Sequence, residues 1–257
     1  MFDLIDECGE DLTSCGYETV KLNRFDICAS KLFVDTAQKA KRLGFEKGHY
    51  FIMNAPLLSS FMEEHREILL AEVGYRLEFL LKENKIKKKS RILFVGIGNP
   101  QIVADSFGVR AVNKISFFPY KKNNRIFKLM PNIFANTGLN AYDVIRLIVE
   151  AFDISAVFLF DSLATTNISR LGTSLQFNDA GLTPGSAMNN FGMPINKTTL
   201  NVPCITFGVP MMISSRSLGV KQGKGAKTEI VLTEKDAEEK VEFLSSLVAQ
   251  VIDSWLE

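Results

Sequence analysis

Two aspartates occupy positions at which an α/β enzyme would place acid–base groups. Asp105 follows the strand-like run Ile92–Val95 and the turn Gly96–Asn99, and Asp161 directly follows the apolar run Ala156–Phe160. In an open α/β sheet the ligand-binding crevice lies at the carboxyl ends of the strands, so carboxylates delivered there from two strands can meet across one site. Such a pair favours acid–base chemistry.

Each of these aspartates also has a structural interpretation. Asp105 precedes a predicted helix beginning near Ser106, and the dipole of that helix would stabilise an ionised carboxylate. Asp161 suits the N-cap of a helix as well as it suits catalysis. A third aspartate, Asp179, lies in a loop shaped by glycine and proline, where aspartates commonly organise turns. The residues alone leave the structural and catalytic interpretations open.

Other kinds of site are disfavoured. The turn Gly96–Pro100 has Gln101 where the dinucleotide fingerprint requires its third glycine, and no phosphate-binding GxxxxGK[ST] occurs. The two histidines, His49 and His65, complete neither a catalytic triad with a GxSxG serine nor a usual zinc site. We therefore expect no cofactor and no metal. We also expect reduced thiols, because the cysteines lack CxxC spacing: Cys8, Cys15, Cys28 and Cys204.

Composition indicates a globular protein rather than a disordered or membrane-spanning one. The chain has 257 residues, of which 46% are hydrophobic and 23% charged, enough to bury the core of a single domain spanning residues 1–257. Its 30 basic and 29 acidic residues give no electrostatic reason to expect a nucleic-acid or membrane partner. No run of about 18 apolar residues occurs, so we expect a cytoplasmic protein.

The pattern along the chain predicts an α/β fold with a mainly parallel or mixed sheet and helices on both faces. Small strand elements precede this core, at 26–33 and 50–54. Helical spacing predicts helices at 57–82 and 140–152 and a closing helix capped by Thr233 with Asp236. The lysine- and glycine-rich segment 219–230 is predicted to be a flexible loop. The predicted core strands are Ile92–Val95, Ile115–Phe118, Ala156–Phe160, Ser174–Phe177 and Cys204–Phe207.

A series of short motifs follows in order along the chain: Phe94–Asn99, Asp105–Gly108, Asn136–Leu139, Phe160–Ala164, Asp179–Ser186 and Phe207–Pro210. Together they resemble the spore germination protease family, the endopeptidases that degrade small acid-soluble spore proteins when endospores germinate. The likeness starts near Arg24 and resumes in the closing helix, so it covers most of the chain. Several ordered motifs are more specific than any one of them.

The resemblance implies a fold similar to the hydrogenase maturation proteases, within the broad phosphorylase/hydrolase-like class. It also implies an atypical aspartic mechanism in which the two catalytic aspartates fall on Asp105 and Asp161. One carboxylate would deprotonate a water, while its protonated neighbour polarises the scissile carbonyl and later protonates the amine. Asn99 and Thr137 would orient the water or the pair. Asp179 and Ser186 would support the site or bind substrate.

The resemblance further implies synthesis as a zymogen with a propeptide-like segment at residues 1–26, assembly as a homotetramer, and action in the cytoplasm of the forespore or spore core. Two alternatives stay open. The first is a non-proteolytic relative that acts as a binding or regulatory protein of sporulation, because the segment after Pro210 is shorter than the family usually has. The second is a maturation protease that uses Asp105 and Asp161 as metal ligands in an oxygen-rich site.

Overall fold

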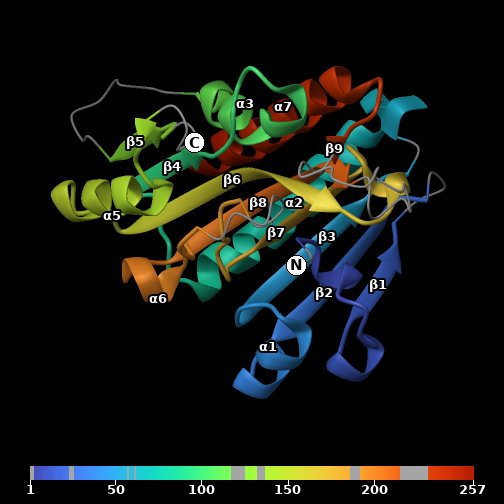
Figure 1. Cartoon of the computed structure of the whole chain (residues 1–257), viewed down its shortest axis with the longest axis horizontal. Helices are drawn as coiled ribbons and strands as arrows, with labels where there is room; N and C mark the ends of the chain where they lie inside the picture. Colours follow the sequence, from blue (N-terminus) through green and yellow to red (C-terminus); the bar gives the residue numbers. More distant parts are fainter. Residues whose placement is uncertain are drawn as a thin grey trace, which may run out of the picture.

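A mixed β-sheet forms the centre of the molecule, and helices cover both of its faces (Figure 1). The structure, a computed structural model, describes residues 3–22, 26–56, 58–60, 62–116, 125–131, 137–185, 192–214 and 231–257. In this part of the chain the sheet has nine strands in the order β1-β2-β3-β7-β8-β6-β4-β5, and β9 pairs with β8. The predicted α/β class, with a mixed sheet, is confirmed.

The sheet has a parallel and an antiparallel half, which meet at β8. The parallel half consists of β5 (Ile126–Leu129), β4 (Ile92–Gly96), β6 (Ala156–Thr165) and β8 (Cys204–Ser214). The antiparallel half consists of β7 (Ser174–Asn178), β3 (Gly48–Asn54), β2 (Cys28–Val34), β1 (Glu18–Lys21) and the short β9 (Val231–Leu232). The small N-terminal strands predicted from the sequence therefore extend the main sheet.

One face of the sheet is covered by α2 (Met62–Glu83), α3 (Phe107–Lys114) and α7 (Ala237–Leu256). On α2 the buried residues Leu69, Val73, Leu77, Leu80 and Leu81 recur at helical spacing, so a single stripe of the helix faces the core. Contacts of α7 with both α2 and α3 complete this layer.

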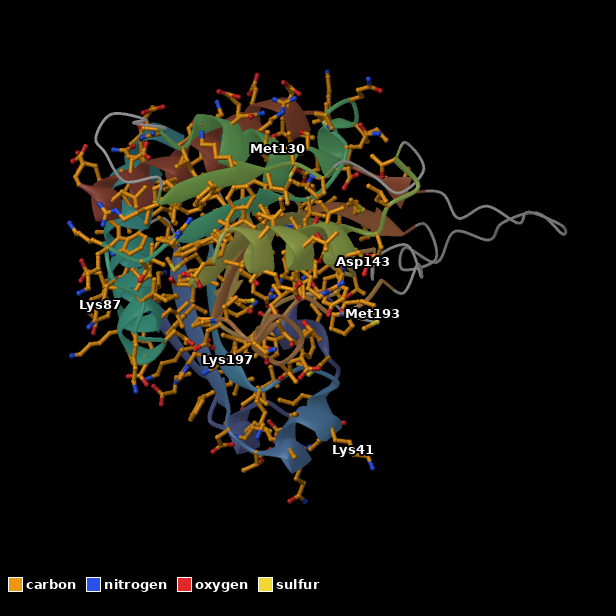
Figure 2. All side chains as sticks on the ribbon, turned by 90° about the vertical axis from the view of Figure 1, so that its left-hand side faces the viewer. Lys41, Lys87, Met130, Asp143, Met193 and Lys197 are labelled. Atoms are coloured by element: carbon orange, nitrogen blue, oxygen red, sulfur yellow. The ribbon has the colours of Figure 1, made fainter. Side chains whose placement is uncertain are left out.

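The opposite face carries α5 (Ala141–Ala151), α6 (Lys197–Leu200) and α1 (Ala37–Leu43). Each begins at a side-chain cap: Asn140 accepts from the Tyr142 amide, Asn196 from the Thr199 amide, and Thr36 from the Lys39 amide. In a side view α1, which carries Lys41, lies at the end of the molecule opposite Met130, the residue after β5 (Figure 2).

Short 3-10 turns connect these elements: η1 (Ile5–Glu7), η2 (Thr13–Cys15), η3 (Leu58–Ser60), η4 (Val103–Asp105) and η5 (Ile168–Arg170). The first two belong to a segment that packs Ile5 against β2 and β3 in its own small core. All four cysteines are free thiols, as predicted. None of the helices in the described part of the chain has the length and apolar character needed to cross a membrane.

One predicted strand, Ile115–Phe118, and one predicted helix cap, Thr233, are wrong. Ile115 is the C-cap of α3 and Ser116 is outside any strand, while residues 117–118 lie outside the described part. The strand beside β4 is β5, which was missed in the sequence because its four residues are too few to show a period.

Thr233 does not cap α7; its hydroxyl donates to the carbonyl of Met211, and the helix begins after Asp236. The segment 219–230 also lies outside the described residues.

A row of phenylalanines fixes the register of the central strands. Phe160 stacks on Phe207 with ring centroids 5.4 Å apart, Phe207 stacks on Phe177 at 5.5 Å, and Phe177 packs against Phe51 at 5.5 Å. All of these rings are buried in the core beneath α2 and α7. Because successive side chains of a strand point to opposite faces, their sequence neighbours must face the other side of the sheet.

Candidate active site

Asp161 faces the side of the sheet opposite the phenylalanine row. Its neighbour Phe160 is fully buried under α7, so the alternation of β6 turns the carboxylate toward the face that carries α1 and α6. The sequence analysis placed Asp161 at a strand end or a helix N-cap, and both expectations are wrong. The strand continues to Thr165, and Asp161 pairs with Gly208 in mid-strand and is only 9% exposed.

Asp105 reaches β6 through a loop that glycines bring close to the strand. The amide of Ile97 donates to the carbonyl of Phe160 at 2.8 Å. A Cβ on Gly108 would lie 2.1 Å from that same carbonyl oxygen, and one on Gly98, whose φ is +115°, would lie 2.0 Å from the carbonyl oxygen of Asp105. Only glycine therefore permits this approach. The carboxylate of Asp105 accepts from the amide of Asn99 at 2.8 Å.

The electrostatics of the two carboxyl groups are coupled. Burial, followed by the negative charges of Asp105 and Asp3, holds the pKa of Asp161 well above its usual range. Burial also raises the pKa of Asp105, against the lowering effect of the Asn99 amide. The sequence pattern predicted that a helix dipole stabilises ionised Asp105. Asp105 ends η4 before α3 begins. Desolvation outweighs its contact with the Asn99 amide, so the net shift of its pKa is upward.

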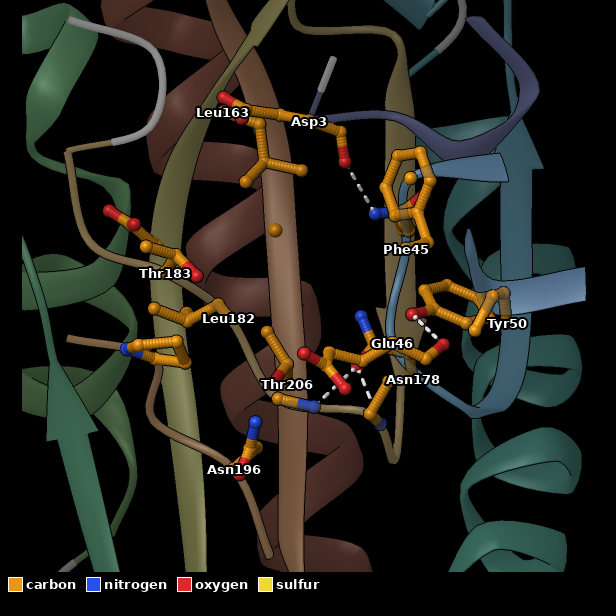
Figure 3. A pocket seen from close by; sticks show the side chains of 18 of the residues that line it. Asp3, Phe45, Glu46, Tyr50, Leu163, Asn178, Leu182, Thr183, Asn196 and Thr206 are labelled. Atoms are coloured by element: carbon orange, nitrogen blue, oxygen red, sulfur yellow. Dashed lines mark hydrogen bonds between the residues drawn. The ribbon is translucent and has the colours of Figure 1, made fainter. Parts of the chain in front are cut away.

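A pocket of about 380 Å³ opens beside Asp161 (Figure 3). In this view Asp3 and Leu163 lie toward one end and Asn196 toward the other, with Thr206 between them. Further lining comes from α1 and the turn after it, from β3, β7 and β8, and from the segment between β7 and α6. Peptide-sized space thus adjoins a buried carboxyl group with a raised pKa.

Three polar residues of this pocket were not identified from the sequence: Gln176, Asn178 and Thr206. Each neighbours a phenylalanine of the row, so the alternation that buries the ring turns the polar side chain into the pocket. The sequence pattern that could have identified them is a polar residue next to a phenylalanine within a buried strand. Thr206 is 2% exposed, and its hydroxyl has no hydrogen-bond partner among the described residues.

Two predicted supporting residues have local roles in the structure. Asn99 holds Asp105 through its main-chain amide, while its side chain accepts from the amide of Gln101 and forms a turn. Thr137 is exposed, and its hydroxyl accepts from the amide of Leu139 in the loop before α5. Ser186 lies outside the described residues.

Asp179 serves as a structural anchor apart from the pocket. Its carboxylate accepts from the amide of His49 at 2.6 Å and from the side chain of Asn84 at 2.8 Å, and it lies 3.2 Å from Nδ1 of His49. Burial alone would raise the pKa of Asp179, but these hydrogen bonds outweigh it and leave the pKa below its usual value. The contacts join β3, β7 and the end of α2.

The composition of the site shows no set of metal ligands. Within the described residues, no three or more histidine, cysteine, aspartate or glutamate side chains gather closely enough to hold a metal ion. Besides Asp161, the pocket lining carries the carboxylates of Asp3 and Glu46 and the polar side chains of Gln176, Asn178, Asn196 and Thr206.

Comparison with known proteins gives a consistent result. The family model of the germination protease, Peptidase_A25, matches residues 10–221. The germination protease of Clostridium acetobutylicum is 23% identical over 93% of this chain and 78% of its own length. Those of Oceanobacillus iheyensis and Bacillus subtilis are 28% and 27% identical over 74% and 70% of this chain. This chain spans about half the length of the latter two, 54% and 52% respectively.

Among solved structures, the [NiFe] hydrogenase maturation protease HycI from Thermococcus kodakarensis KOD1 is similar over 64% of this chain and 93% of its own. The sequence identity is 20% and the TM-score 0.38.

Proposed function

Because this chain belongs to the germination protease family, we propose that it is an endopeptidase that hydrolyses small acid-soluble spore proteins with Asp105 and Asp161. The observation that carries the proposal is the buried carboxyl of Asp161 in a pocket, with a pKa raised by burial and by the charge of Asp105. Two carboxyl groups with unequal affinities for a proton provide the acid and the base that peptide hydrolysis needs.

In the proposed reaction Asp105 is ionised and Asp161 is protonated. Asp105 takes a proton from a water whose oxygen attacks the scissile carbonyl carbon, while Asp161 donates a hydrogen bond to the carbonyl oxygen. When the C–N bond breaks, the amine nitrogen takes the proton of Asp161. Transfer of the proton from Asp105 to Asp161 then restores the pair. The stronger desolvation of Asp161 supports this assignment of roles.

The remaining features of the proposal follow from the family. We propose that residues 1–257 act as one peptidase-like domain, with residues 1–26 as a propeptide-like segment and 219–230 as a flexible basic loop. The enzyme would work as a homo-oligomer, a tetramer as the family resemblance implies, in the cytoplasm of the forespore or spore core. Its partners would be protein substrates, with no requirement for nucleic acid, membrane, metal or cofactor.

The test is cleavage of purified small acid-soluble spore proteins by the wild type and by the Asp105→Asn and Asp161→Asn variants. Asp179→Asn is the matched control, because Asp179 is another largely buried aspartate but, unlike Asp105, is not among the charges that raise the pKa of Asp161. Neither Asp105 nor Asp179 lines the pocket. We expect cleavage by the wild type and the control and its loss in both site variants. Folded wild-type protein that binds these substrates without cutting them would favour the non-proteolytic alternative.

A further inference from the structure

The main chain of residues 3–5 is bound by a single side chain of the sheet. Nε2 of Gln176 donates to the carbonyl of Asp3 at 2.9 Å, and the amide of Ile5 donates to Oε1 of Gln176 at 2.9 Å. The residue between them, Leu4, is extended, with φ −94° and ψ 127°. A carboxamide that bonds residue i and residue i+2 holds an extended peptide much as a neighbouring strand would.

A second contact lies next to the candidate catalytic carboxyl group. The carboxylate of Asp3 accepts from the amide of Ala164 at 2.8 Å, three positions beyond Asp161 on β6. The pairing of β6 with β8 shifts register between Leu163 and Ala164, an irregularity that makes a main-chain donor accessible beside the pocket. Asp3 lines the same pocket as Asp161 and its charge helps to raise the pKa of that group.

These contacts hold a peptide at the edge of the pocket, where Asp3 lines it, and they do so largely through the main chain. Two of the three bonds use the backbone of residues 3–5, so another extended peptide could make them. Thr206, on the neighbouring strand, lines the same pocket, and its hydroxyl has no hydrogen-bond partner within the described part of the chain. We infer that Gln176 binds the main chain of the substrate next to Asp161, and that residues 3–5 occupy this place in the present structure. The inference rests on the proposed function and names a binding residue for it.

The next residues of the segment are held outside the pocket. Nη1 of Arg170 donates to the Asp6 carboxylate at 2.6 Å, and Nη2 contacts its other oxygen. The Glu7 carboxylate accepts from the amide of Thr166 at 2.7 Å. None of Asp6, Glu7, Thr166 and Arg170 lines the pocket. Weakening this anchor should therefore release residues 3–5 without altering the proposed peptide-binding groups.

The experiment uses the full chain and three substitutions. Asp6→Asn keeps the shape of the anchor but removes its charge. Gln176→Met keeps the length of the side chain but removes both hydrogen-bonding atoms. Ser174→Ala is the matched control, because Ser174 lies on the same strand and face as Gln176, is equally buried, and bonds instead to the side chain of Asn54.

The kinetic readout is cleavage of a small acid-soluble spore protein. Asp6→Asn should lower KM about tenfold with kcat unchanged. Adding Gln176→Met to Asp6→Asn should raise KM about tenfold again with kcat unchanged, and adding Ser174→Ala should not. The readout independent of activity is amide hydrogen exchange of residues 3–7, which should rise about tenfold in Asp6→Asn alone and in Gln176→Met alone.

The outcomes separate this inference from the proposed function. If the single variant Asp6→Asn and the double variant Asp6→Asn/Gln176→Met cleave with the same KM, the inference is overturned and the protease assignment stays intact. Unchanged exchange of residues 3–7 in Gln176→Met would also overturn it. If no form cleaves, fluorescence anisotropy of the labelled spore protein decides. Binding to Asp6→Asn that Gln176→Met weakens about tenfold supports the inference, whereas equal or undetectable binding overturns it.

Discussion

Asp161 and Asp179 are both largely buried carboxylates beside the same sheet, yet their surroundings have opposite electrostatic effects. Around Asp179, the His49 amide, the His49 ring and the Asn84 side chain provide hydrogen bonds that stabilise the charge, so its pKa is lowered. Around Asp161, burial and the charges of Asp105 and Asp3 outweigh one main-chain hydrogen bond, so its pKa is raised. Burial alone therefore does not determine the direction in which the pKa of a carboxyl group shifts; the hydrogen-bond donors and the charges that face it also contribute.

This difference separates a site suited to proton transfer from one suited to holding the fold together. A carboxyl group with a raised pKa can donate its proton to a substrate. The same raised pKa lowers the free energy of unfolding of the protein at a pH where the group is ionised in the unfolded chain. A carboxylate surrounded by donors is stable in its charged form and links the elements that supply the donors.

Asp161→Asn should lower the rate of spore-protein cleavage by about 10²–10⁴-fold, the usual contribution of a general acid. The same variant should have a higher Tm than the wild type at pH 7. The ionised Asp161 of the unfolded chain must take up a proton or stay charged in a buried place when the protein folds, and a neutral amide removes that cost. A change of 1 kcal/mol corresponds to about 2–4 °C in a protein of this size. Cleavage assays and calorimetry measure both effects. Retained activity, or a lower Tm at pH 7, would contradict the assignment.

Gly98→Ala should reduce cleavage by about 10–100-fold, because a Cβ would lie 2.0 Å from the Asp105 carbonyl oxygen and the backbone φ is +115°. The loop must shift and carry the Asp105 carboxylate with it. Gly74→Ala is the control: it lies within α2, a Cβ there meets nothing within 4 Å, and alanine should stabilise the helix by about 1 kcal/mol. Wild-type kcat in Gly98→Ala would show that this close approach is dispensable.

Asp179→Asn should destabilise the fold by about 1–3 kcal/mol. The charge-assisted hydrogen bonds from His49 and Asn84 are weakened, and the NH2 group of the new asparagine faces N–H donors with which it cannot form a hydrogen bond. Cleavage per folded molecule should change by less than about threefold. Urea unfolding measures the first quantity and cleavage at a temperature far below Tm measures the second. A loss of activity comparable to that of Asp161→Asn, with little change in stability, would reverse the roles of the two aspartates.

The stability effects of these two variants should depend on pH in opposite directions. The raised pKa of Asp161 stabilises the wild type fully below the usual carboxyl pKa of about 4, and this contribution is lost as pH rises through the folded-state pKa. The Tm advantage of Asp161→Asn should therefore grow as pH rises above about 4. The lowered pKa of Asp179 stabilises the wild type above that value and is lost as pH falls through the folded-state pKa. The deficit of Asp179→Asn should therefore shrink in acid. If the Tm difference from the wild type changed with pH in the same direction for both variants, the opposite pKa shifts of Asp161 and Asp179 would be contradicted.

Local patterns were sufficient to predict much of the framework. The apolar runs that became β4, β6, β7 and β8 and the helical stripe of α2 depend on periodicity within a segment, and each prediction is confirmed. The ordered motifs around Asp105 and Asp161 were sufficient to identify the family. By contrast, the four-residue strand β5 and the start of α7 depended on pairing and packing partners far along the chain: β5 was missed, and the cap of α7 was predicted wrongly.

The sequence by itself determined the class of fold, the family and two acidic residues that could act together. Only the tertiary structure decided that Asp161 lies in mid-strand, that Gln176, Asn178 and Thr206 share its face, and that Asp3 reaches the same pocket. The physical reason is that periodicity is a local property, whereas burial and electrostatic coupling arise between segments that are distant in the sequence. Asp105 acts on Asp161 in this way, and Asp3 contacts Ala164 at a separation of 161 residues.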